Sequence, residues 1–214
     1  MTVLSHFASN YLSHVIQGDK KECLEIARKY LDGGRSMTEL YEKVLKQALY
    51  EVGRLWESNK ISVATEHMST AITESILNEL YYDFNFNVNE NKKVVLACAE
   101  NEQHQVGIKM VGDVFEKHGW DTFFLGTGIP VTELISFIHE KKPDALAISL
   151  SIYFNYRGLN NMLIEITNEF PNLEILLGGQ AFSRLSAELV NNFPETKIIN
   201  SLYDLNQYLE TKPK

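Results

Sequence analysis

The stretch that decides the fold is VVLACAENEQHQVG, residues 94–107. Its first six residues are apolar or small on both sides of the chain, as expected for a strand buried on both faces of a sheet. The polar residues 100–105 end that strand, and an apolar pattern with helical spacing follows them. The stretch therefore predicts a strand, a polar turn and a helix.

The same alternation continues to the end of the chain. Short apolar runs fall at residues 94–97, 122–125, 145–148, 174–177 and 197–199, and a helical pattern follows each. Runs of this kind are typical of parallel strands covered by helices on both faces. We therefore predict an α/β domain with a flavodoxin-like, Rossmann-type, doubly wound parallel sheet of five strands. Ligands of such sheets bind beyond the carboxyl ends of the strands.

Residues 1 to about 90 contain no convincing strand. Helical spacing of apolar residues predicts four helices, the first over residues 5–17. Ser36 with Glu39 forms a capping-box signature for the third helix, and Ser62 caps the fourth. Short connections favour an antiparallel four-helix bundle. Because residues 85–93 are polar and aperiodic, we expect domains over residues 1–88 and 89–214.

Composition excludes several classes of function. The formal charge is −8 and no cluster of Lys and Arg occurs, so we expect no direct binding to nucleic acid. Cys23 and Cys98 have no disulfide or metal-type spacing and read as small core residues. The sequence shows neither a membrane-spanning stretch nor a signal peptide, and the expected location is the cytoplasm.

His104 is the strongest candidate for a metal ligand. Glu102 lies two residues earlier, so its carboxylate can reach the ring nitrogen that does not face a metal and can fix the tautomer. Gly107 has no side chain, which lets a bulky planar ligand lie close to the backbone. Polar or small residues also end two later strands, and we expect them to face the same crevice: Ser149, Ser151, Gly178 and Gly179.

Together these residues resemble the cobalamin-binding domain, whose pattern is Asp-x-His-x-x-Gly, Ser-x-Leu and Gly-Gly. The resemblance implies that His104 is the lower cobalt ligand, with Glu102 and Ser149 as a hydrogen-bonded relay behind it. It also implies that Gly178 and Gly179 line a slot for the nucleotide tail of the cofactor. Two positions depart from the pattern: Glu102 replaces the commoner Asp, and Ser151 replaces Leu.

A second motif lies in the helical half. A Trp at the end of an apolar stripe is usually core, and Glu-His at a helix start is usually solvated. However, Trp56, followed ten residues later by Glu66 and His67, resembles the helical cap of MerR-type adenosylcobalamin photoreceptors. The resemblance implies that the bundle covers the upper face of the corrin, with Trp56 on the 5′-deoxyadenosyl group and Glu66 hydrogen-bonding near it.

These motifs favour a stand-alone, non-enzymatic light sensor with adenosylcobalamin as cofactor. Because the chain begins almost directly on the bundle, we expect no DNA-binding domain, no membrane association, and a signal that leaves through a homo-oligomer or a protein partner. One alternative is a corrinoid methyl carrier of a methyltransferase system, which would use methylcobalamin. Another is a sensor for a different tetrapyrrole, such as haem or a bilin.

Overall fold

The computed structural model describes residues 4–84, 86, 92–183, 193 and 196–212. The chain forms two compact units, Met1–Phe84 and Asn85–Lys214. The expected boundary between residues 88 and 89 falls outside the described residues, so its position stays a prediction.

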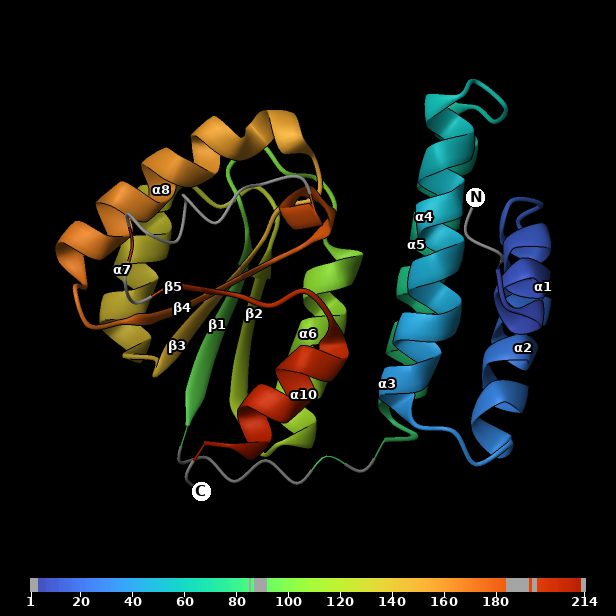
Figure 1. The fold of residues 1–214 in the computed structure, drawn as a ribbon, viewed down its shortest axis with the longest axis horizontal. Coiled ribbons are helices and arrows are strands. Elements are labelled where there is room, and N and C mark those ends of the chain that lie inside the picture. Colours follow the sequence, from blue (N-terminus) through green and yellow to red (C-terminus); the bar gives the residue numbers. More distant parts are fainter. Residues whose placement is uncertain (1–3, 85, 87–91, 184–192, 194–195, 213–214) are drawn as a thin grey trace. The chain divides into compact units, whose positions relative to one another are not determined.

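The first unit is helical, as the periodicity predicted (Figure 1). Its elements are α1 (His6–Val15), α2 (Lys20–Asp32), α3 (Met37–Leu40), the π-helical turn η1 (Tyr41–Leu45), α4 (Lys46–Glu57) and α5 (Val63–Tyr81). Since α3, η1 and α4 follow one another without a break, residues 4–84 form four helical runs. The π turn was not predicted, because an apolar stripe does not distinguish a π turn from an α turn.

Local sequence signals fix where the helices begin. The Ser36 hydroxyl accepts a hydrogen bond from the Glu39 N–H and the Glu39 carboxylate accepts one from the Ser36 N–H, which confirms the capping box. Ser62 caps α5 by accepting from the N–H of Thr65. In the core the Tyr11 hydroxyl is 3.0 Å from that of Thr73, so α1 and α5 are joined by a buried polar contact.

The second unit contains a five-stranded, all-parallel sheet, as predicted. Its strands lie in the order β2-β1-β3-β4-β5, which is the flavodoxin-like order. They are β1 (Lys93–Cys98), β2 (Asp121–Gly126), β3 (Ala145–Ser149), β4 (Glu174–Gly178) and β5 (Thr196–Ile198). Within the described residues the helices are α6 (Val106–Lys117), α7 (Val131–Lys141), α8 (Tyr156–Glu169) and α10 (Leu202–Glu210), with short 3-10 turns η2 (Tyr153–Asn155) and η3 (Gln180–Ser183).

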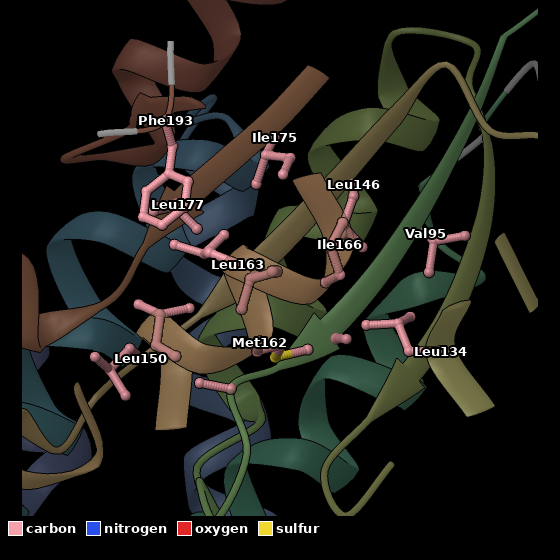
Figure 2. Packing of buried hydrophobic residues seen from close by; sticks show 14 of the residues in the cluster. Val95, Leu134, Leu146, Leu150, Met162, Leu163, Ile166, Ile175, Leu177 and Phe193 are labelled. Carbon is pink, nitrogen blue, oxygen red and sulfur yellow. The ribbon is translucent and has the colours of Figure 1, made fainter. Parts of the chain in front are cut away.

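Helices cover both faces of this sheet (Figure 1). Alternate strand residues such as Val95, Leu146 and Ile175 pack with α7 and α8 into one buried apolar cluster (Figure 2). Leu96, on the opposite face, lies against α6 at Gly112. Strands buried on both faces explain why the apolar runs in the sequence are continuous and not alternating.

Cys23 and Cys98 are buried and free, as expected for small core residues. Among the helices that the structure describes, none combines the length and the apolar character that crossing a membrane requires.

Candidate functional site

Three adjacent strand ends bring the sequence motifs together. Cys98 at the end of β1 pairs with Ser149 at the end of β3, which in turn pairs with Gly178 at the end of β4. The contact continues past the strands, because the N–H of Ala99 donates to the carbonyl of Ser149 over 2.9 Å. The Glu102–Gly107 turn, the Ser149–Ser151 turn and the Gly178–Gly179 turn therefore share one edge of the sheet.

Glu102 and His104 form the polar centre of this edge. The Glu102 side chain is fully buried, whereas that of His104 is 42% exposed. The His104 Nδ1 nitrogen hydrogen-bonds to the Glu102 Oε1 atom, which fixes the proton on Nδ1. With that tautomer, Nε2 carries the lone pair that a metal ion needs.

Main-chain N–H groups hold the Glu102 carboxylate from two sides. Oε1 accepts from the N–H of Gln103 and His104 at 2.9 and 3.1 Å, and Oε2 accepts from the N–H of Ser151 and Ile152, both at 2.8 Å. Burial alone would raise the pKa of this carboxyl, but the His104 ring and these N–H groups lower it to about 2. Glu102 is therefore a fixed anion that orients the ring of His104.

The two serines of the motif have different positions. Ser149 is buried at the end of β3, and its hydroxyl is not among the hydrogen-bond donors to Glu102. Ser151 contributes its main-chain N–H, as does Ile152. The resemblance implied a relay from Glu102 to the Ser149 hydroxyl; in this structure the atoms behind Glu102 belong to the backbone. Sequence reasoning missed Ile152 because a main-chain donor leaves no residue-type signal.

Cys98 contacts the turn that carries His104. Its thiol donates to the carbonyl of His104 over 3.6 Å. Burial, and after it the nearby charge of Glu102, raises the pKa of the thiol to about 12. Cys98 therefore stays neutral and acts as a small packing residue under the histidine.

The glycines of the motif differ in what surrounds them. Gly179 has a φ of +111°, and a Cβ there would lie 2.3 Å from the carbonyl oxygen of Leu150. A Cβ on Gly178 would lie 3.2 Å from the carbonyl oxygen of Ile199. Both glycines thus allow close packing of neighbouring turns. By contrast, a Cβ on Gly107 would meet no atom within 4 Å from other parts of the described chain, so the first turn of α6 leaves room for a ligand.

Trp56 and Glu66 flank the connection between α4 and α5 in the helical unit. Trp56 is 39% exposed, so it is not the core residue that a stripe end usually is. Glu66 is mostly buried; its carboxylate accepts a hydrogen bond from the Thr70 hydroxyl at 3.0 Å and another from the Nδ1 atom of His67. The His67 side chain is 77% exposed. The helical unit thus presents an aromatic face and a positioned carboxylate.

The residues at the sheet edge suit a corrinoid. A half-exposed imidazole that is held by a buried carboxylate through Nδ1 can offer Nε2 to a transition metal, and its second nitrogen is already engaged. The open position at Gly107 lies three residues further, where a flat macrocycle bound to His104 would approach the helix. His104 is the residue that could bind the metal, and Glu102 is the one that would orient it.

Comparison with known families agrees with this geometry. One family model described as a B12 binding domain matches residues 8–81, and another with the same description matches residues 92–196. The two models together cover both units, and the chain belongs to the B12-binding domain proteins. Its cofactor is accordingly a cobalamin or related corrinoid, which confirms the predicted cofactor class and fold.

The relatives include transcriptional repressors and corrinoid proteins. The chain is 25% identical to the HTH-type transcriptional repressor CarH of Myxococcus xanthus over 66% of its own length and 47% of that protein. It is 23% identical to the methanol–corrinoid protein of Methanosarcina barkeri over 73% of its length and 62% of that protein. The structure of the Methanosarcina barkeri monomethylamine corrinoid protein superposes with a TM-score of 0.80 at 15% identity, covering 96% of this chain and 98% of that one, which shows the shared fold. The chain thus spans between about half and about three fifths of the length of the two curated relatives.

Proposed function

We propose that the protein is a light sensor that binds adenosylcobalamin. The observation that carries the proposal is the half-exposed Trp56 together with the positioned carboxylate of Glu66, in a chain that also holds the Glu102–His104 pair. The similarity to CarH agrees with a regulatory role, while the similarity to corrinoid proteins agrees equally with a carrier role, so the choice rests on Trp56 and Glu66. When bound, adenosylcobalamin supplies the light-sensitive step, because light breaks its cobalt–carbon bond.

The residues of the two units have separate tasks in this proposal. His104 binds cobalt from the lower side, and Glu102 keeps its ring in one tautomer and orientation. The exposed indole of Trp56 offers a flat surface on which the adenine of the upper ligand can stack. Glu66 keeps acceptor capacity for a sugar hydroxyl, because each carboxylate oxygen accepts more than one hydrogen bond.

The signal would arise in the helical unit. Loss of the adenosyl group removes the packing partner of Trp56, so the ligand-free arrangement of the bundle gains population. A changed bundle surface then alters self-association or the binding of a protein partner. His67 is exposed and lies next to Glu66, and any second histidine that approached cobalt after the group has left would have to be His67.

The test is reconstitution with adenosylcobalamin in the dark, followed by absorbance and size-exclusion chromatography before and after green light. We expect photolysis to shift the elution volume. Trp56→Ala should weaken adenosylcobalamin binding about tenfold and abolish the shift. Tyr50→Ala, which removes an aromatic of similar exposure from the same helix, is the matched control and should change neither. Complete photolysis with unchanged elution would refute the signalling role.

The second candidate is a corrinoid methyl carrier, and the relatives favour it specifically. The methanol–corrinoid protein and a corrinoid protein of Desulfitobacterium hafniense both align, the latter at 23% identity over 81% of this chain and 83% of that protein. In this role His104 would hold methylcobalamin for exchange with a methyltransferase. Tighter binding of methylcobalamin than of adenosylcobalamin, with no effect of Trp56→Ala on either, would reverse the ranking.

A further inference from the structure

Asn155 occupies the N-cap position of α8 without capping the helix. At this position an asparagine side chain usually accepts a hydrogen bond from an N–H group of the first turn, but the Asn155 side chain makes no such bond. Its amide donates to the main-chain carbonyl of Asn101, over 3.2 Å, in the loop that follows β1. The side chain therefore links the start of α8 to the loop that carries Glu102 and His104.

The carbonyl that Asn155 holds belongs to the peptide group directly before Glu102. The N–H of the same peptide group donates to the carbonyl of Ala99 over 3.0 Å and closes a tight turn. Asn101 has a φ of +65° in this turn, a left-handed conformation that asparagine adopts more readily than most residues. Both polar atoms of one planar peptide group are thus fixed, and together they set the direction in which the chain enters Glu102.

Other contacts from the same segment reach the neighbouring residues of the loop. The main-chain N–H groups of residues 151 and 152 donate to the Glu102 carboxylate. In α8, a Cβ on Gly158 would lie 3.2 Å from the carbonyl oxygen of Glu100, so the helix packs closely on the loop there. Residues 151–158 therefore hold Glu100, Asn101 and Glu102 in succession. Of the hydrogen bonds in this set, the one from Asn155 comes from a side chain, so a substitution can remove it.

We propose that Asn155 is a positioning residue for the cobalt ligand. By holding the peptide group before Glu102, its amide keeps the Glu102 carboxylate in the place from which it orients the His104 ring. This inference rests on the part of the proposed function in which His104 binds cobalt. It does not depend on the upper ligand of the cofactor, so it applies to a light sensor and to a methyl carrier alike.

Asn155→Asp tests the role of the donor group. Aspartate has nearly the same shape and is as good an N-cap residue, but its carboxylate cannot donate to the Asn101 carbonyl. The urea midpoint of the apoprotein should stay nearly unchanged, since a new cap on α8 offsets the lost contact. In NMR spectra of the apoprotein the Nδ1 proton of His104 should exchange with solvent about fivefold faster, which is the order of effect of one lost hydrogen bond. Absorbance titrations should show Kd values for adenosylcobalamin and methylcobalamin that both rise about fivefold.

Three further variants complete the experiment. Asn155→Ala removes the donor without adding a charge, and it should give the same changes in proton exchange and Kd. Asn161→Asp adds the same charge at an exposed position of α8 and should give neither. In a His104→Ala background, Asn155→Asp should leave both Kd values unchanged, because the residue through which it acts is absent.

The possible results separate this inference from the function on which it rests. Unchanged proton exchange and Kd in Asn155→Asp, with or without a lower urea midpoint, would overturn the inference and leave His104 as the cobalt ligand. An equal rise in Kd with and without His104 would also overturn it, because Asn155 would then act on the cofactor by another route. If His104→Ala bound both cobalamins as tightly as the unchanged protein, the assignment of His104 in the proposed function would fail, and the inference with it.

Discussion

Glu102, which is buried, and Glu174, which is partly buried, lie at opposite ends of the strands of the same sheet and have similarly lowered pKa values but different neighbours. Glu102 lies at the carboxyl edge, held by main-chain N–H groups and the His104 ring. Glu174 is the first residue of β4, at the amino edge, where Lys197 and Lys212 donate to it at 2.7 Å each. Burial would raise the pKa of each carboxyl, and these hydrogen bonds lower both to about 2.

The two carboxylates differ in the side chains that they hold by hydrogen bonds. Glu174 holds two lysine side chains, which are cations and cannot bind a metal. Glu102 holds an imidazole that is 42% exposed and can bind one. A lowered pKa therefore marks a carboxylate with good hydrogen bonds, and the group that it orients decides whether the place is a binding site.

Among the substitutions that test this comparison, Glu102→Ala should have the largest effect on stability. Removing the carboxylate leaves four partly buried main-chain N–H groups without this acceptor, so we expect the α/β unit to lose about 3 kcal/mol of unfolding free energy. Urea unfolding followed by Trp120 fluorescence in a Trp56→Phe background reports this unit alone, because the chain has 2 tryptophans. A loss below about 1 kcal/mol would show that the N–H groups find other acceptors.

The next effect is on ligand binding. His104→Ala should weaken cobalamin binding at least about 100-fold and remove the absorbance signature of histidine coordination, while unfolding free energy changes by less than about 1 kcal/mol. The exposed ring contributes little to the core, which is why stability and binding separate. His139→Ala, at an exposed histidine paired with Glu169, is the control. An unaltered spectrum of the bound cofactor in His104→Ala would exclude it as the cobalt ligand.

At the amino end of β4 we expect substitution of Glu174 to change the stability of the protein and to leave cobalamin binding unchanged. The pKa of Glu174 lies below the ordinary value of 4.5, so its contribution is complete above pH 4.5 and is lost as the pH falls toward about 2. Glu174→Gln should lower unfolding free energy by about 2 kcal/mol at pH 7 and flatten the acid dependence between those limits. Urea unfolding at pH 7 and pH 3 measures both, and cobalamin titration should give an unchanged Kd.

Glu140→Gln provides the smallest effect and the control for charge removal. Its ion pair with Lys141 is exposed, so unfolding free energy should change by less than about 0.5 kcal/mol at either pH. If this variant matched Glu174→Gln, the effect at β4 would come from net charge and not from its specific lysine partners.

Much of this arrangement could be predicted from the sequence, because its signals are local. Continuous apolar runs indicated the strands, Ser36 and Ser62 indicated helix starts, and the spacing of Glu102 and His104 indicated their contact. What could not be predicted depends on main-chain atoms or on residues far apart in the chain. The N–H groups of Ser151 and Ile152 have no residue-type signature, and Lys212 reaches Glu174 only because β4 and the end of the chain meet in the fold.

The exposure of Trp56 could not be predicted from the sequence for a different reason. A tryptophan at the end of an apolar stripe is compatible with burial and with exposure, and its 39% exposure depends on how the end of α4 packs within the unit.

The main-chain anchors of Glu102 also determine how much sequence change this edge of the sheet can tolerate. Every residue type except proline supplies a main-chain N–H group, so substitutions other than proline at positions 151 and 152 keep both donors to the carboxylate. Ser151, in place of the leucine expected by the motif, is one such change. The side chains of the turn after β3 can thus change to suit a new ligand tail or partner. The hydrogen bonds that hold Glu102, and with it the orientation of the His104 ring, stay in place.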